Sequence, residues 1–243
     1  MAGPDRTTDD GPTSGCGTPL DALGVLASQE IAVAPGFRHL ELFTRTGLLT
    51  ILWHGTGDER AAVVAMGGAM GGLLGPANGL YHHLGVVLAR DHGIAVLRIG
   101  YRRPNDLEAC TLDAAVAVQL AVDSGAASVA TMGHSFGGAV AVRAAVLLPR
   151  MVSAVVTFAT QSAGCEVAAG LEGRPLLLFH GDADEILPVQ ASHVVRDIAG
   201  SGEVVVLPGD GHLLARSGDA IAERLVTWLP SALSGGGAFP NPA

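Results

Sequence analysis

The chain contains no lysine, so all 14 of its permanently cationic residues are arginines. Without a lysine amine, the protein cannot form a Schiff base with a carbonyl substrate or pyridoxal phosphate, nor can it build a Walker-type phosphate loop. Cysteine is also scarce. Cys16, Cys110 and Cys165 are an odd number at scattered spacings, typical of a reduced protein and not of a disulfide framework. We therefore expect a cytoplasmic protein with no metal site.

Positive charge is in the minority over the whole chain. The formal net charge of -9 leaves no basic excess to neutralise phosphates, so we expect neither nucleic acid nor a membrane as a partner. The 243 residues, 49% of them hydrophobic, suffice for one sizeable core. We expect a single domain over residues 20–233, between a disordered segment of residues 1–19 without signal-peptide character and a flexible tail of residues 234–243. The oligomeric state is left open.

One apolar segment has the length of a membrane span. The run from Ala61 to Leu80 carries no charge, and Gly67 and Gly71 have the spacing of helix-dimer motifs. Its many glycines, together with a proline and an asparagine, make a poor helix. The segment is better interpreted as a buried strand that leads into a glycine-rich loop.

Strand-like apolar runs alternate with longer helix-like runs along the rest of the chain, after an opening hairpin around Thr46-Gly47. The strand-like runs are Leu40 to Thr44, Leu48 to Trp53, Ala62 to Met66, Ile94 to Ile99, Ser128 to Met132, Val152 to Phe158, Pro175 to Phe179 and Glu203 to Leu207. The helix-like runs are Asn78 to Asp91, Leu107 to Asp123, Phe136 to Leu148, Val189 to Ala199 and Asp219 to Leu233. This alternation predicts an α/β fold with a mainly parallel sheet.

A short motif lies between one of these strands and the next helix. Gly133-His134-Ser135-Phe136-Gly137-Gly138 contains G-x-S-x-G, the pattern of a tight turn that pushes a serine hydroxyl outward and needs glycines because its backbone is crowded. Ser135 is therefore a candidate nucleophile. His134 is more typical of a packing residue than of a catalyst.

Further polar residues follow the later strands, and parallel sheets bind ligands at the carboxyl ends of their strands. A serine hydroxyl needs an imidazole to accept its proton. His212, in a flexible turn after the last strand, is the candidate base, and a surface-loop histidine is the alternative. An acid must then orient the imidazole, and Asp182, Asp184 and Glu185 follow another strand.

These motifs, in the order serine, acid, histidine, resemble the α/β-hydrolase family, in particular serine esterases and dienelactone-hydrolase-like members with a minimal core. Family members often carry H-G-x-x-D-x-x-V-P after the seventh strand. Here that motif matches His180 to Pro188, which implies Asp184 as the acid, with Asp182 as the alternative. The resemblance also implies a three-layer fold with about eight strands and helices on both faces of the sheet, no cofactor, and a small-molecule acyl substrate.

The resemblance further implies an oxyanion hole of two backbone amides. One amide belongs to Phe136, directly after the nucleophile. The other comes from the loop Met66 to Gly72 and is assigned to Gly68, with Ala69 next to it. Met66 stands where the family often has a histidine, so the register of this loop is open. The candidate substrate contacts are Ala69, Met70 and Gln161.

Family members often insert a lid after the sixth strand, whereas here only Thr160 to Gly173 is available. We therefore expect an open cleft. The implied reaction is hydrolysis of a carboxylic ester through an acyl-enzyme on Ser135. A thioesterase or peptidase would use the same residues, and a ligand-binding homologue without turnover is the alternative of another class. Arg102 and Arg103 either bind a substrate carboxylate or form a structural or solvated pair.

Overall fold

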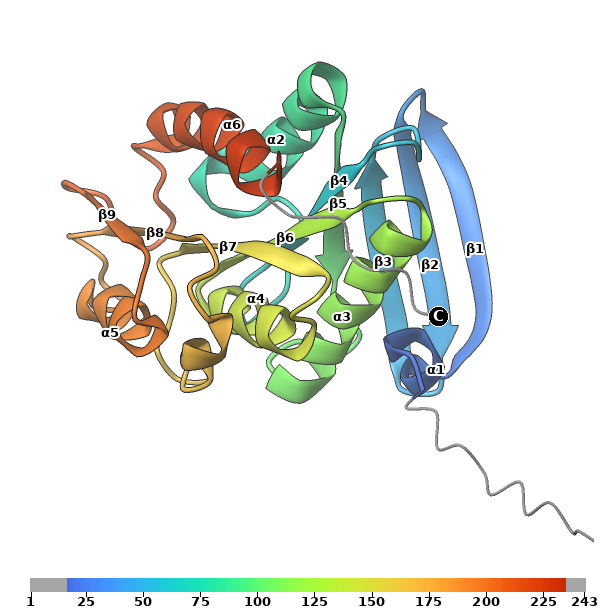
Figure 1. The fold of residues 1–243 in the computed structure, drawn as a ribbon, viewed down its shortest axis with the longest axis horizontal. Coiled ribbons are helices and arrows are strands. Elements are labelled where there is room, and N and C mark those ends of the chain that lie inside the picture. Colours follow the sequence, from blue (N-terminus) through green and yellow to red (C-terminus); the bar gives the residue numbers. More distant parts are fainter. Residues whose placement is uncertain (1–16, 235–243) are drawn as a thin grey trace, which may run out of the picture.

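The computed structural model describes residues 17–234. Residues 1–16 and 235–243 lie outside the described residues, and the expected disordered segment and flexible tail fall almost wholly there. The described chain forms one nine-stranded sheet (Figure 1). Its strands are β1 (Val25–Ala34), β2 (Phe37–Thr44), β3 (Gly47–His54), β4 (Ala61–Met66), β5 (Ile94–Gly100), β6 (Ser128–His134), β7 (Val152–Phe158), β8 (Leu176–Gly181) and β9 (Glu203–Leu207).

The strand order is β1-β2-β3-β5-β4-β6-β7-β8-β9. The first three strands are antiparallel to one another, and β3 is antiparallel to β5. From β5 to β9 every pairing is parallel. The carboxyl ends of β4, β6, β8 and β9 therefore meet at one edge of the sheet, which is the edge where ligands bind in such folds.

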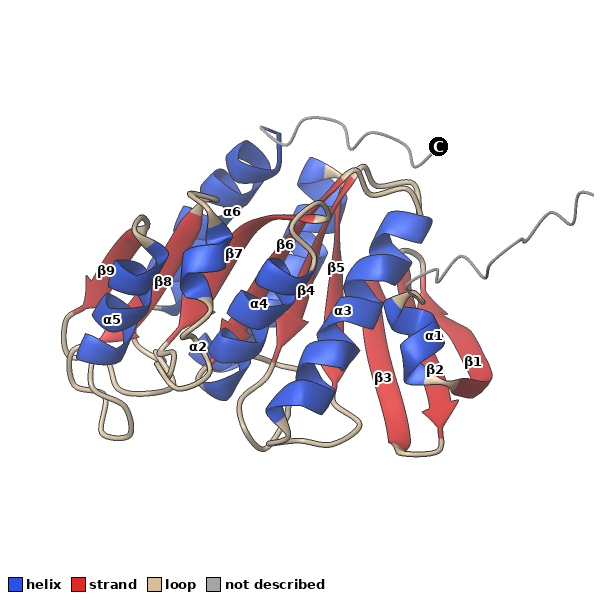
Figure 2. Cartoon of the chain, turned by 60° about the horizontal axis from the view of Figure 1, so that its bottom comes forward, coloured by secondary structure: helices blue, strands red, loops and turns tan. Residues whose placement is uncertain are grey.

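Helices cover both faces of the sheet (Figures 1 and 2). They are α1 (Pro19–Leu23), α2 (Pro76–His92), α3 (Leu107–Asp123), α4 (Phe136–Leu147), α5 (Gln190–Ala199) and α6 (Gly218–Ser234), with a short 3₁₀ helix at Ala168–Leu171. The core has two parts, one on each side of the sheet. One contains α2 and α6 with residues such as Leu84 and Leu225, and the other contains α3 and α4 with residues such as Val116 and Val140.

The predicted three-layer α/β fold is confirmed, and its predicted strands and helices occur in the predicted order. The sheet has one strand more than the eight expected, because β1 was missed. Nine of the ten residues of β1 are exposed, so the strand lacks the alternation of buried and exposed positions by which strands are recognised. Helix α1 was also missed, although Thr18 and Asp21 form a capping box at its start.

The uncharged run from Ala61 to Leu80 divides into strand β4, a loop and the first turn of α2. All residues of β4 except Ala61 are buried, as expected for a strand covered on both faces. No helix within residues 17–234 is long and apolar enough to cross a bilayer. The interpretation as a strand entering a loop is therefore confirmed.

A buried polar pair joins the neighbouring strands β3 and β5. Arg98 on β5 is 3% exposed, and its Nη2 lies 2.9 Å from Nε2 of His54 on β3. Because a guanidinium only donates, His54 accepts through Nε2 and is neutral. Burial, together with the charge of Arg98 and the neighbouring His82, lowers the pKa of His54 to about 4.

This pair predicts a loss of stability in acid. Unfolded His54 takes up a proton near pH 6.5, but folded His54 does so only near pH 4, so the unfolded state binds more protons between these values and stability falls as the pH is lowered through them. His54→Gln retains an acceptor for Arg98 and removes the titration. We expect its Tm to fall less than that of the wild type between neutral pH and pH 4, as measured by thermal unfolding.

The exposed His83 provides a control. His83→Gln leaves Arg98 and its partner in place, so its Tm should follow the pH dependence of the wild type. Equal losses of Tm in the wild type and in His54→Gln would show that His54 does not contribute to acid destabilisation.

Candidate active site

Ser135 lies in a strained turn between β6 and α4. Its φ of 56° and ψ of -118° are unfavourable for a residue with a side chain, a form of strain that concentrates at functional sites. The Ser135 amide donates to the carbonyl of Phe158 on β7 over 2.8 Å, and the residue is partly exposed. The turn therefore presents a hydroxyl to solvent at the carboxyl edge of the sheet.

Glycines make this turn possible. A Cβ atom on Gly133 would overlap the carbonyl of Gly137, and one on Gly137 would overlap the carbonyl of Gly67. The same contact joins the turn to the loop after β4. A Cβ atom on Gly68 would lie 3.9 Å from the Cβ atom of Ser135, so the structure brings the predicted oxyanion residue beside the predicted nucleophile.

Two tyrosines donate hydrogen bonds to backbone carbonyls of this glycine loop, Met66 to Gly72. Tyr81 donates its hydroxyl to the carbonyl of Met66 over 2.9 Å, and Tyr101 donates to that of Gly67 over 3.2 Å. They are the two tyrosines of the whole chain, and both are buried. Burial raises the pKa of each hydroxyl well above its usual value, so both remain donors. No sequence motif pointed to either residue.

Asp184 and His212 form a hydrogen-bonded pair at the same edge. His212 Nδ1 lies 2.8 Å from Asp184 Oδ2, and the Asp184 side chain is fully buried. The other carboxylate oxygen accepts from the amides of Ile186 and Leu187 over 2.8 and 2.9 Å. Burial alone would raise the pKa of Asp184, but these amides and His212 outweigh it and hold the pKa below its usual value. The carboxylate is thus ionised and fixes the proton of His212 on Nδ1.

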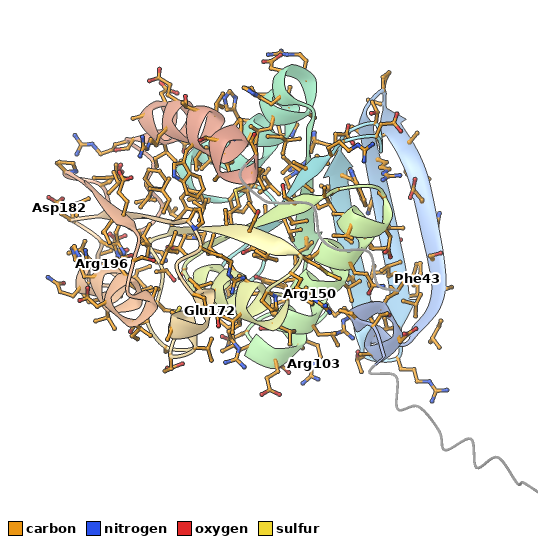
Figure 3. The ribbon with its side chains drawn as sticks, in the orientation of Figure 1. Phe43, Arg103, Arg150, Glu172, Asp182 and Arg196 are labelled. Atoms are coloured by element: carbon orange, nitrogen blue, oxygen red, sulfur yellow. The ribbon has the colours of Figure 1, made fainter. Side chains whose placement is uncertain are left out.

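Asp182, the alternative acid, does not contact His212. Its Oδ1 accepts from the amide of Gly209 over 2.6 Å, and Figure 3 shows the residue at the periphery of the molecule, near β9. The carboxylate of Glu185 lies against Gly211. Of the three carboxylates in this segment, only Asp184 therefore reaches the imidazole.

His180, the first residue of the motif that contains Asp184, supports this carboxylate. It is fully buried, and its Nε2 lies 3.2 Å from Asp184 Oδ2 and 3.1 Å from the carbonyl of Leu187. Its Nδ1 lies 2.7 Å from the hydroxyl of Ser192. Because the Leu187 carbonyl can only accept, Nε2 carries the proton and Nδ1 accepts from Ser192. Burial lowers the pKa of His180, so it donates to the carboxylate as a neutral ring.

The hydroxyl of Ser135 and the amide of Phe136 have no hydrogen-bond partner within residues 17–234. Among the hydrogen bonds of residues 17–234, none joins the hydroxyl of Ser135 to His212. Such bonds are often long in unliganded enzymes and tighten when substrate binds. The amide of Phe136 belongs to the first turn of α4, where amides have no partner within the helix. That amide is therefore free to bind an oxygen.

The predicted substrate contacts differ in exposure. Met70 is 93% exposed, whereas Ala69 packs partly against the core. Gln161 donates its side-chain amide to the carbonyl of Ala163 over 2.7 Å, and its backbone amide lies 3.4 Å from the carbonyl of Ser135. The Gln161 side chain is thus engaged within its own loop, next to the nucleophile.

Arg102 and Arg103 are both paired with carboxylates. Arg102 forms a buried ion pair with Asp113 and also donates to Thr46 over 2.7 Å. Arg103 pairs with Asp106 over 2.7 Å. The structural interpretation of these two arginines therefore agrees with their contacts, and neither side chain is an unpaired cation at the strand ends.

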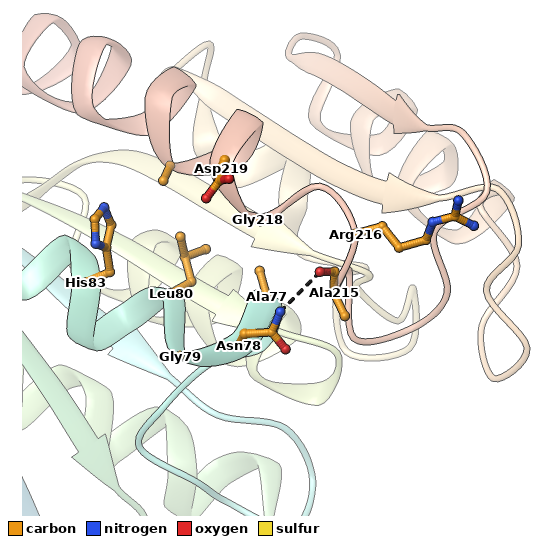
Figure 4. Close-up of a pocket in the computed structure, with 10 residues that line it drawn as sticks. Ala77, Asn78, Gly79, Leu80, His83, Ala215, Arg216, Gly218 and Asp219 are labelled. Atoms are coloured by element: carbon orange, nitrogen blue, oxygen red, sulfur yellow. Dashed lines mark hydrogen bonds between the residues drawn. The ribbon is translucent and has the colours of Figure 1, made fainter.

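The segment after His212 is tied to the start of α2. Ala77 donates its amide to the carbonyl of Leu213 over 2.7 Å, and the Asn78 side chain donates to the carbonyl of Ala215 over 3.1 Å (Figure 4). Ala77 and Asn78 have positive φ angles of 50° and 57°. A cavity of about 310 Å³ lies between α2 and α6 here, but none of Ser135, Asp184 and His212 lines it.

No metal or thiol chemistry is evident in the described part of the chain. Residues 17–234 contain no group of three histidine, cysteine or acidic side chains arranged to hold a metal ion. Cys110 and Cys165 are buried, and burial raises the pKa of each thiol to about 12, so both are inert thiols at neutral pH.

Comparison with solved structures identifies the architecture. No family model and no curated protein matches the chain in sequence. Est1E from Butyrivibrio proteoclasticus superposes with a TM-score of 0.67 at 15% identity, covering 81% of this chain and 99% of its own. The dienelactone hydrolase of Anabaena variabilis gives 0.65 at 20% identity, covering 83% and 97%. The chain has the α/β-hydrolase fold.

An α/β serine hydrolase homologue from Coxiella burnetii agrees, with a TM-score of 0.61 at 19% identity over 79% of this chain and 96% of its own. In this chain the turn with Ser135 (the elbow) after β6, Asp184 after β8 and His212 after β9 lie at one edge of the sheet.

Proposed function

We propose that this protein is a serine hydrolase that cleaves carboxylic esters through an acyl-enzyme on Ser135. The observation that carries the proposal is the hydrogen bond between His212 Nδ1 and the fully buried Asp184, at the same sheet edge as the strained Ser135. Because Nδ1 holds the proton, Nε2 of His212 has a free lone pair and acts as the general base.

In the proposed reaction, Ser135 Oγ attacks the ester carbonyl while its proton moves to Nε2 of His212. Asp184 stabilises the imidazolium that forms. The amides of Phe136 and Gly68 bind the oxyanion. The tetrahedral intermediate collapses, the C–O bond of the alcohol breaks, and His212 returns the proton to the departing alkoxide. Water then attacks the acyl-enzyme with His212 again as base. The bond between the acyl carbon and Ser135 Oγ breaks, His212 returns the proton to Oγ, and the carboxylic acid leaves.

The rim of the proposed site is apolar. Met70, Leu74, Ile186 and Leu213 are more than 60% exposed. Met70 lies in the glycine loop (Met66 to Gly72) and Leu74 just after it, whereas Ile186 and Leu213 closely follow Asp184 and His212. Exposed apolar groups beside a reactive centre are typical of a surface that a ligand covers. We therefore propose that the acyl group of the substrate lies against these side chains.

Charge at the same rim favours neutral substrates. Arg102 and Arg103 are paired with carboxylates, whereas Asp182 and Glu185 are exposed beside the segment that carries His212. Within residues 17–234, the one cation at this rim without a carboxylate partner is the exposed Arg216, which donates to the carbonyl of Gly209 over 3.2 Å. An anionic substrate would therefore meet two carboxylates and a single arginine. The proposed substrate is therefore a neutral ester with an apolar acyl chain.

The hydrolytic activity is tested first. We expect the wild type to hydrolyse p-nitrophenyl acetate or butyrate, and Ser135→Ala to lower kcat by several orders of magnitude because the nucleophile is removed. Spectrophotometric release of nitrophenolate measures both, and a fluorophosphonate probe should label only the wild type. A wild type with no turnover and no labelling, but with saturable ligand binding, would support a binding protein in place of a hydrolase. Faster turnover of a matched thioester would favour the thioesterase alternative.

The acid is tested by comparing two neighbouring aspartates. Asp184→Asn removes the carboxylate that orients His212, and we expect kcat to fall by about 10³- to 10⁴-fold. Asp182→Asn is the matched control. It alters a turn contact with Gly209 and should reduce kcat only a few-fold, with ester hydrolysis as the measurement. The reverse ranking would refute the role of Asp184.

Substrate preference is tested at the apolar rim. Met70→Ser and Leu213→Ser should lower kcat/KM for a p-nitrophenyl hexanoate ester by about 3- to 10-fold relative to the acetate ester, because apolar contact with the longer chain is lost. The wild type should also prefer the neutral butyrate ester to the anionic hemisuccinate ester.

Ile31→Ser provides the control for these rim variants. Ile31 is an exposed apolar residue on β1, away from the strand ends that carry the site, so this substitution should leave the chain-length preference unchanged. An identical effect of all three serine variants would remove the support for acyl binding at the rim. Equal rates with neutral and anionic esters would argue against the selection by charge.

A further inference from the structure

His134 lies directly before Ser135 and is a buried side chain that the proposed reaction leaves without a role. Its Nε2 is 2.9 Å from the backbone carbonyl of His212, and the two imidazole rings are 4.8 Å apart. A carbonyl can only accept, so His134 donates through Nε2. Burial lowers the pKa of His134 to about 4, so the ring is neutral and its one N–H is committed to this bond.

The other side of the His134 ring faces the glycine loop. A Cβ atom on Gly68 would lie 3.6 Å from Nδ1 of His134 and 3.9 Å from the Cβ atom of Ser135. One imidazole thus lies between the loop that supplies the oxyanion amide and the segment that supplies the base. It belongs to the elbow itself, so it touches all three parts of the proposed machinery.

The segment that carries His212 is also held on either side of that residue. Ala183 donates to the carbonyl of Asp210 over 3.0 Å, and Ala77 donates to the carbonyl of Leu213 over 2.7 Å. The carbonyl of His212 itself is held by His134. Asp184 fixes how the His212 ring rotates, whereas the bond from His134 fixes where the backbone places that ring relative to the neighbouring Ser135.

We infer that His134 is a positioning residue, which holds the backbone of His212 so that Nε2 of the base reaches the hydroxyl of Ser135. The inference rests on the proposed serine hydrolase function. Small displacements of a catalytic group lower the rate strongly, by about 10²-fold for a shift of about 1 Å. His134 acts through His212 and does not itself exchange a proton with the substrate.

Two substitutions separate the hydrogen bond from the packing. His134→Leu fills the space without a donor, whereas His134→Gln places an amide N–H at a similar reach. We expect His134→Leu to lower kcat by roughly 10- to 100-fold with KM little changed, because substrate contacts are retained. His134→Gln should recover most of this loss. The rate of fluorophosphonate labelling should fall in parallel with kcat, since labelling also needs an activated Ser135.

Ser128, at the amino end of β6, provides a control for general destabilisation. Ser128→Ala removes a buried hydrogen bond of 2.8 Å to the carbonyl of Leu233 and should lower Tm while leaving kcat unchanged below the unfolding transition. A kcat for His134→Leu equal to that of the wild type would overturn the inference. Equal losses of kcat in His134→Leu and His134→Gln, with no rescue by the amide, would overturn it as well.

A spectroscopic measurement distinguishes failure of this inference from failure of the proposed function. In ¹⁵N-histidine-labelled protein, NMR should show His134 as the neutral Nε2–H tautomer and a slowly exchanging Nδ1–H on His212. The Nδ1–H of His212 should exchange faster in His134→Leu and resemble the wild type in His134→Gln. These signals need no turnover. An inactive wild type with this pattern would refute the hydrolase and retain the positioning, whereas an active wild type with unchanged exchange in His134→Leu would refute the positioning alone.

Discussion

The site depends on a contact between two backbones that no side chain could enter. Gly137, in the first turn of α4, lies against the carbonyl of Gly67, and Gly133 lies against the carbonyl of Gly137. This close approach allows β6 to turn directly into α4 with Ser135 at positive φ. A strained conformation of this kind costs about 1–3 kcal/mol and persists only where its surroundings over-determine it. The same contact makes the elbow and the glycine loop one rigid unit, so the position of Gly68 beside Ser135 follows from the packing of glycines.

Around this unit, single side chains hold loops that are distant in sequence. Tyr81 and Tyr101 bind the carbonyls just before Gly68, and Asn78 binds the segment just after His212. The two tyrosines are buried, so removing either hydroxyl would leave a backbone carbonyl unsatisfied in a dry environment. The bond from Asn78 is exposed. The loop after β4 is thus held from within the core, while the apolar rim stays open to solvent.

The parts of this structure that could be predicted from the sequence are those with a local signal. Gly133 to Gly138 combines a strand, a tight turn and a helix, and the motif from His180 to Pro188 carries Asp184, the partner of His212, at a set spacing. Strand β1 gave no such signal because it is exposed along nearly its whole length. The bond from His134 to His212 joins residues 78 positions apart, so it arises only when β6 and the turn after β9 lie at the same edge of the sheet. The hydroxyls of the two tyrosines likewise find their acceptors only through packing.

Three buried histidines lie within this small region, and their partners decide which of them can be a base. His180 has both nitrogens engaged, by Ser192 on one side and by Leu187 and Asp184 on the other. His134 donates through Nε2, and a pKa of about 4 makes its other nitrogen a poor proton acceptor at neutral pH. His212 alone has an ionised carboxylate on Nδ1, which stabilises the protonated ring, and its Nε2 has no hydrogen-bond partner among residues 17–234. In the proposed reaction, histidine therefore serves as a support for the acid, as a support for the backbone of the base and as the base itself, according to what each ring nitrogen contacts.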